Sequence, residues 1–134
     1  MSDKEVFLDL NKVRLYGYES GKSDKVIDAV VRGIEQGDVF PPVIVCQVTE
    51  DEYLILRPDG GHNRAVGHYI ANKPLRCIVR DIDDPTEGYV PDQKVRDFVE
   101  ADWPERVFIG DVELVDDDKI VANYEHRKRT RVYR

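Results

Sequence analysis

A chain of 134 residues suits one domain, which buries about two-thirds of its unfolded surface and needs no disulfide or metal to hold it together. Apolar residues make up 41% of the chain and charged residues 35%, and the net charge at pH 7 is −7. Residues 126–134 hold five basic and no acidic side chains, so residues 1–125 carry 15 basic and 27 acidic side chains. Such an acidic surface repels a phosphate backbone, which excludes broad, nonspecific binding of residues 1–125 to nucleic acid.

The sequence predicts a cytoplasmic protein without a membrane anchor. Charged residues occur within the first ten positions, where a signal peptide needs an apolar core. The longest strongly apolar run, residues 39–48, falls well short of the ~20 residues of a membrane-spanning helix. Cys46 and Cys77 lie in separate predicted strands without the spacing of metal ligands, so we expect two small buried side chains.

Hydrophobic patterning in the first 80 residues predicts four strands. They are expected at residues 5–10, 43–48, 53–56 and 75–80. The second of these is nearly continuous in β-branched residues, which is typical of a strand covered on both faces. Residues 13–18 either extend the first strand or form a turn, and residues 19–23 are expected to be an exposed loop.

Two helices are expected among these strands. Apolar side chains recur at helical spacing over residues 26–34, Ser23 or Asp24 is placed to cap the start of that helix, and Gly37 closes it. The second helix follows a pair of glycines and turns the apolar side chains of residues 65–70 to one side.

The composition changes after residue 80. The next residues are acidic and rich in turn formers, which indicates a linker or flap, and a helix is expected at residues 93–103. We expect residues 107–109 and 112–115 to form a β-hairpin and residues 120–124 to form a last strand. Together the elements predict an α+β fold, a small mixed sheet with helices, in which residues 1–80 form the core and residues 81–134 complete the same domain.

The strongest candidate site lies in residues 58–72, PDGGHNRAVGHYIAN, where a helix opens directly after Gly60 and Gly61. The first N–H groups of a helix have no partner within it, and the helix dipole adds partial positive charge there, so this end attracts anions. Arg64 falls in the first turn, and its planar guanidinium suits two phosphate oxygens at once. An ordinary structural turn, with Arg64 paired to a surface carboxylate, is the alternative.

These residues resemble the phosphate-binding turn of the ParB/sulfiredoxin superfamily, which includes ParB-like nuclease domains. The segment GDVFPPVIV, residues 37–45, also resembles the part of that superfamily where a helix ends, a proline pair follows and a strand begins. The resemblance covers roughly residues 8–79. It implies a ParB/sulfiredoxin-like fold that binds a nucleoside triphosphate, or a nucleic-acid phosphate, through Gly60, Gly61, His62, Asn63 and Arg64.

Members of this superfamily share the site and differ in chemistry. They include sulfinic acid reductases, CTP-binding partition proteins, a free-serine kinase and proteins described as nucleases. His62 stands where the sulfiredoxins have their catalytic cysteine, so the resemblance does not bring sulfinic acid reduction to this chain. Glu19 lies near the place where the related serine kinase has its essential carboxylate.

Phosphoryl transfer needs a group that orients the nucleophile and a carboxylate that helps to hold magnesium. We predict catalytic roles for Glu19 and His62, with His62 donating to the transferred phosphoryl group or polarising the leaving oxygen. Asp59 is the predicted metal ligand, and the expected cofactor is ATP or CTP with Mg²⁺. The alternative is that Glu19 and Asp59 are solvated loop residues without a role in the chemistry.

The favoured hypothesis is therefore a nucleotide-binding NTPase or phosphotransferase. A non-catalytic module of the partition or regulatory type, which binds DNA or a partner protein, is the first alternative, and a metal-dependent nuclease is the second. The basic residues 126–134 would lie along a DNA backbone or fit the acidic face of a second subunit in a homodimer. A disordered, solubilising tail is the alternative for this segment.

Overall fold

The computed structural model describes residues 4–56, 61–85 and 94–116. Its strands are β1 (Lys4–Leu8), β2 (Arg14–Gly17), β3 (Gly21–Ser23), β4 (Val43–Thr49), β5 (Glu52–Ile55), β6 (Leu75–Arg80), β7 (Val107–Phe108) and β8 (Glu113–Val115). Its helices are α1 (Asp24–Glu35), α2 (His62–Ala71) and α3 (Val95–Asp102), with short 3₁₀ turns η2 (Trp103–Glu105) and η3 (Ile109–Asp111). The mixed α+β class predicted from the hydrophobic patterning is confirmed.

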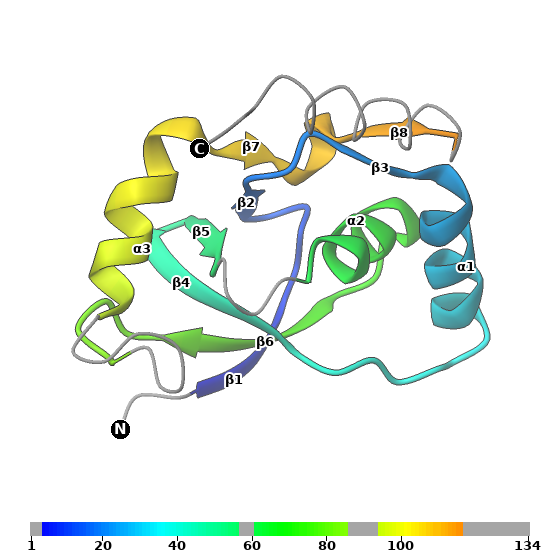
Figure 1. The fold of residues 1–134 in the computed structure, drawn as a ribbon. Coiled ribbons are helices and arrows are strands. Elements are labelled where there is room, and N and C mark those ends of the chain that lie inside the picture. Colours follow the sequence, from blue (N-terminus) through cyan, green and yellow to red (C-terminus); the bar gives the residue numbers. More distant parts are fainter. Residues whose placement is uncertain (1–3, 57–60, 86–93, 117–134) are drawn as a thin grey trace, which may run out of the picture.

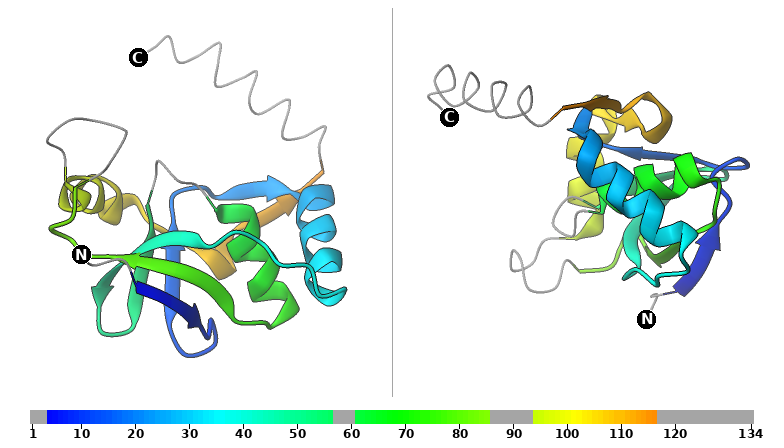
Figure 2. Two further views of the ribbon diagram at one scale, coloured as in Figure 1. Left: turned by 90° about the horizontal axis from the view of Figure 1, so that it is seen from below. Right: turned by 90° about the vertical axis from the view of Figure 1, so that its right-hand side faces the viewer.

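Six strands form one mixed sheet in the order β1-β6-β4-β5-β2-β7. The pairs β4–β6 and β2–β5 are parallel, and the other neighbours are antiparallel. Helix α3 lies on one side of this sheet, whereas α2 and then α1 lie on the other (Figure 1). The two further views show the same arrangement, with β3 and β8 beside the start of α1 (Figure 2).

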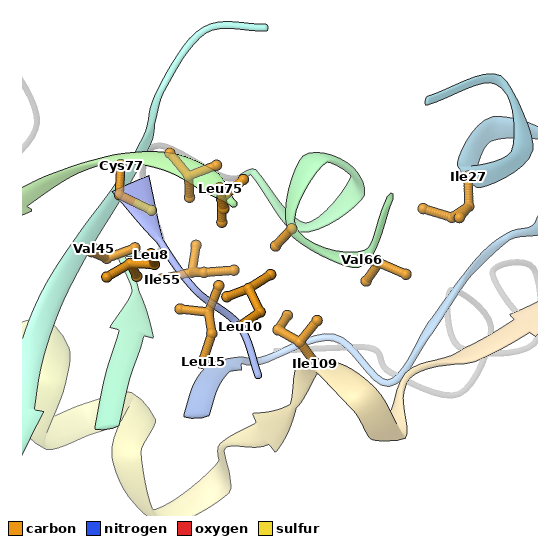
Figure 3. Close-up of a cluster of buried hydrophobic side chains, with 12 residues drawn as sticks. Leu8, Leu10, Leu15, Ile27, Val45, Ile55, Val66, Leu75, Cys77 and Ile109 are labelled. Carbon is orange, nitrogen blue, oxygen red and sulfur yellow. The ribbon is translucent and has the colours of Figure 1, made fainter. Parts of the chain in front are cut away.

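Buried apolar side chains gather on both faces of the sheet. The larger cluster lies between the sheet and α2 and includes Leu15, Val66 and Ile109 (Figure 3). The smaller one lies under α3. Strand β4 contributes Val45 to the first cluster and Cys46 to the second, so the prediction of a strand covered on both faces is confirmed.

The ends of α1 follow the signals in its sequence. The Ser23 hydroxyl accepts a hydrogen bond from the Val26 N–H at 3.3 Å, which satisfies one of the free donors of the first turn. At the other end Gly37 has a φ of +91°, its N–H donates to the Ile34 carbonyl, and the Asp38 N–H donates to the Gly33 carbonyl. This pair of bonds is a Schellman motif, which only a residue tolerant of the left-handed region permits.

Two local predictions in the first quarter of the chain are refined. Residues 14–17 are neither an extension of β1 nor a turn, but a separate strand, β2, which pairs with β5 and β7. The predicted exposed loop at residues 19–23 is wrong in its second half, because Gly21–Ser23 forms β3 and pairs in parallel with β8. A partner about ninety residues further along the chain supplies this pairing, and no local pattern announces it.

The predicted hairpin at residues 107–115 is wrong. Strand β7 pairs with β2 and β8 pairs with β3, and η3 connects them. Burial explains the difference, because Ile109 is only 2% exposed and belongs to the core cluster under α2, where a hairpin tip would leave it in solvent. The predicted strand at residues 120–124 lies outside the described residues.

None of the helices in the described part of the chain combines the length and the apolar composition that crossing a lipid bilayer requires.

Candidate functional site

The candidate site lies at the start of α2, and Gly61 is the one glycine of the predicted turn that falls within the described residues. Gly61 is the N-cap, with a φ of +107°, and within the described residues no side-chain hydrogen bond caps the first turn. A Cβ at Gly61 would lie 2.7 Å from Val43 Cγ1, so both the backbone conformation and the packing against β4 require glycine. Whereas Ser23 caps α1 with its hydroxyl, the N-cap of α2 is a glycine, which has no such group.

His62 is the first residue of α2, and its side chain is buried. Its exposed fraction is 3%, and its Nε2 accepts a hydrogen bond of 3.0 Å from the Tyr18 main-chain N–H. The Tyr18 ring packs edge-on against the imidazole, with 4.4 Å between the ring centroids. Because Nε2 is an acceptor, the neutral imidazole carries its proton on Nδ1.

Gly17 makes this contact possible. A Cβ at Gly17 would lie 2.1 Å from His62 Nε2, which no side chain can tolerate without moving the ring. The last residue of β2 is therefore shaped to receive the imidazole from α2. A glycine that ends a strand pattern is the sequence signal for such a close approach, and it points to Gly17 and Tyr18 as site residues that the motif alone does not reveal.

Glu19 follows directly and faces the other ring nitrogen. Its Oε1 lies 3.9 Å from His62 Nδ1, a distance too long for a hydrogen bond. The side chain remains 42% exposed, so the carboxylate is accessible to a ligand. The two predicted catalytic residues, distant in sequence, are thus brought together by the fold.

The same Glu19 oxygen forms an ion pair that sequence patterning did not single out. Lys22 Nζ donates to Glu19 Oε1 at 2.7 Å, and the lysine side chain is 21% exposed. Lys22 lies in β3, opposite Leu114 of β8, so the pairing of these two strands sets its position. The spacing of three residues between Glu19 and Lys22 is common in loops and carries no signal by itself.

Arg64 binds the protein's own backbone. Its Nη1 donates to the carbonyl oxygens of Pro41 and Pro42, at 2.8 Å and 3.0 Å. The guanidinium therefore ties the proline pair before β4 to the first turn of α2, and its positive charge stays at that turn. The predicted contact between Arg64 and a phosphate stays a prediction, and it would use the other donors of the guanidinium.

Asn63 is the remaining predicted residue that the structure describes. Its side-chain Oδ1 is buried and accepts no hydrogen bond from residues 4–56, 61–85 and 94–116. Most buried acceptors are paired in folded proteins, because an unpaired one costs about 1–3 kcal/mol. Asp59 and Gly60 lie outside the described residues, and so does the predicted metal contact of Asp59.

Two features of the described residues bear on other chemistry. Within residues 4–56, 61–85 and 94–116, no group of three or more histidine, cysteine or acidic side chains is arranged to hold a metal ion. Cys46 and Cys77 are buried free thiols, as predicted. Burial raises the pKa of Cys46 to about 11 and that of Cys77 to about 12, so both stay protonated at neutral pH and are poor nucleophiles.

Comparison of the chain with models of protein families and with curated proteins returned no match. The candidate site is therefore characterised by its geometry. It combines a helix N-terminus with a glycine N-cap, a buried imidazole, an accessible carboxylate and two cationic side chains.

Proposed function

We propose that this chain is a ParB/sulfiredoxin-like domain that binds ATP or CTP with Mg²⁺ at the start of α2, and that it acts as an NTPase or phosphotransferase. The observation that carries the proposal is the meeting of Glu19 with His62 at the first turn of α2. An anion site alone would support only binding. An accessible carboxylate held beside it supplies the group that phosphoryl transfer needs.

The phosphate groups would lie in front of the first turn of α2. The N–H groups of a first turn and the helix dipole, equivalent to about half an elementary charge, favour an anion at this position. The N-cap is a glycine, which leaves room for close approach and offers no side-chain group of its own as a cap. The guanidinium of Arg64 adds a full positive charge beside this turn.

Glu19 is the proposed general base, and His62 is a positioning residue. A water molecule or an acceptor hydroxyl attacks the terminal phosphorus as its proton passes to Glu19. The bond from that phosphorus to the bridging oxygen breaks, and the nucleoside diphosphate leaves. His62 is too buried to reach the ligand, but its bond to the Tyr18 N–H holds the backbone that carries Glu19.

The side chains present fit a magnesium ion that arrives with the nucleotide. Mg²⁺ is commonly held by one or two carboxylates, with phosphate oxygens and water completing its octahedron, so a site needs few protein ligands. Glu19 serves as the base, so Asp59, the predicted metal ligand, is the candidate carboxylate for the ion. When bound, the ion would neutralise charge that develops on the phosphate oxygens.

The first prediction separates chemistry from binding. Substitution Glu19→Gln is expected to lower phosphate release from ATP or CTP by about 100-fold or more, because the general base is lost, while nucleotide binding persists. Phosphate release and isothermal titration calorimetry measure the two quantities. Glu35→Gln, an exposed carboxylate near the end of α1, is the matched control and should behave as the wild type.

Arg64→Ala is a less selective probe than Glu19→Gln, because it also removes the two bonds to the proline pair. A wild-type protein that neither binds any nucleotide in the calorimeter nor releases phosphate would overturn the proposal. In that case, nicking of supercoiled plasmid would indicate the nuclease alternative. Salt-sensitive DNA binding without turnover would indicate the binding module.

A further inference from the structure

An open apolar groove lies along α1. It has a volume of about 420 Å³. Its apolar lining is formed by Val26, Ala29, Val30, Gly33 and Phe40. Val26 is 43% exposed, whereas Ile27 and Ile34 of the same helix are buried in the protein. The helix therefore has one apolar set toward the core and a second that remains partly in water, and we refer to this second surface as the α1 groove.

The two ends of the α1 groove carry opposite charges. Lys25 lines the end at the first turn of the helix, and Asp38 lines the far end, beyond the C-terminus of the helix. A Cβ at Gly33 would lie 2.9 Å from Asp38 Oδ2 and 3.0 Å from Phe40 Cζ, so this glycine allows both side chains to lie against the helix. An occupant that fits the groove is therefore acidic beside Lys25, apolar in the middle and basic beside Asp38.

Residues 117–134 of this chain, which lie outside the described residues, have that order of side chains. Residues 117 and 118 are both acidic, residues 120–124 include three large apolar side chains, and residues 126–134 hold five basic and no acidic side chains. A single lysine and a single glutamate separate the three groups. The segment is therefore complementary to the groove in both charge and apolar character.

The fold brings this segment to the correct end of the α1 groove. Strands β3 and β8 are parallel, and Val115 is paired with Ser23, the N-cap of α1. The chain therefore leaves β8 in the direction in which it enters α1, with β8 beside the start of that helix (Figure 1). The five residues from Val115 to Ile120 span at most ~17 Å, and the helix is ~18 Å long, so the apolar residues can reach the middle of the groove.

We propose that residues 117–134 dock along the α1 groove of the same chain. The apolar side chains of residues 120–124 cover Val26 and its neighbours, and the removal of this surface from water favours docking. The acidic pair lies beside Lys25 and the basic residues lie beside Asp38, where exposed ion pairs set the direction of the segment and contribute little free energy. The basic residues are then held at α1 and not along a phosphate backbone. This docking goes beyond the proposed nucleotide chemistry and does not depend on it.

Limited proteolysis of the full-length chain tests the docking, because trypsin cleaves after the basic residues of 126–134 while they are undocked. The rate of cleavage then follows the population of the undocked state. Val26→Asp places a charge in the groove and leaves the cleaved sequence unchanged, so cleavage should be faster than in the wild type by about fivefold to 30-fold. Ile70→Asp is the matched control, because Ile70 of α2 is 49% exposed and is not among the residues that line the groove, and it should be cleaved at the wild-type rate.

A spin label tests where the segment docks. Cys46 and Cys77 are buried thiols, so a nitroxide reagent reacts selectively with the new thiol of Asn123→Cys. The label should broaden the backbone amide signals of α1 and of Phe40 more than those of α3, which lies on the other side of the sheet (Figure 1). A mixture of the labelled chain with an unlabelled, isotope-enriched chain should show no such broadening, because the docking is within one chain.

Equal rates of cleavage for the wild type and Val26→Asp would overturn the proposal, and so would amide signals of α1 that the attached label leaves unchanged. Broadening between separate chains would assign the groove to a second copy and overturn docking within one chain. Nucleotide binding in the calorimeter tests the proposed function separately, so failure of one does not decide the other.

Discussion

Gly17 illustrates how one missing side chain can organise a site. The imidazole of His62 lies against the backbone of β2, where a Cβ at Gly17 would be 2.1 Å from Nε2 and 2.6 Å from Cδ2. This close approach allows Nε2 to accept the Tyr18 N–H. The position of Glu19, the next residue, is thereby linked to the start of α2.

Gly17→Ala is expected to destabilise the protein by about 1–3 kcal/mol, because the added methyl group forces the imidazole out of its place. Urea unfolding measures the change in the free energy of unfolding. Gly21→Ala is the control, since a Cβ at Gly21 would meet only the Glu113 carbonyl oxygen at an ordinary 3.8 Å. In a His62→Ala background the cost of Gly17→Ala should fall sharply, and an unchanged cost would contradict the proposed clash.

At the scale of elements, β3 is a short strand with several tasks. Lys22 is its middle residue, and its last residue, Ser23, caps α1. Just before the strand, the Ser20 carbonyl accepts a hydrogen bond of 2.7 Å from the Glu113 N–H, at the start of β8. The segment after β2 is thus tied to a helix on one side and to the end of the described chain on the other. These ties hold the backbone that bears the candidate carboxylate.

Ser23→Ala removes the side-chain cap of α1 and is expected to cost about 1 kcal/mol of stability, because the Val26 N–H loses its acceptor. Thermal or urea unfolding measures the loss. Ser20→Ala offers a matched comparison, since Ser20 is exposed and uses its main-chain carbonyl in the bond to Glu113. Equal stabilities of the two variants would show that the cap contributes little.

At the scale of the whole molecule, the sheet depends on both ends of the described chain. Val95 and Val99 of α3 are buried against Tyr16 and Leu54, and Ile109 of η3 is buried with the residues under α2. Strand β7 closes the edge of the sheet beside β2. Residues after position 80 therefore cover apolar surface on both faces.

A chain that ends at residue 80 is expected to lose cooperative folding, because the face of the sheet under α3 and one part of the opposite cluster would be exposed to water. Near-ultraviolet circular dichroism and urea unfolding, compared with the full-length protein, test this expectation. A cooperative transition in the shortened chain with the slope of the full-length protein would show that residues 1–80 fold alone.

Much of the local structure was predictable from the sequence. The strand at residues 75–80 has the predicted bounds, α1 begins at the predicted cap and ends before Gly37, and α2 opens from the predicted glycine. Each of these features depends on side chains within a few residues: a hydroxyl before a helix, a glycine after it, or a run of β-branched residues. Local free energies decide such features before any distant contact forms.

The sequence by itself therefore determined the α+β class, the ends of α1 and the bounds of β6. Only the tertiary structure decided that Tyr18 would bond to His62, 44 residues away, that Lys22 would share the oxygen of Glu19, and that Arg64 would first bind two proline carbonyls. It also decided the partners of β7 and β8. Such choices depend on which strand edges and buried surfaces remain to be paired once the core has formed, and no neighbouring residue encodes them.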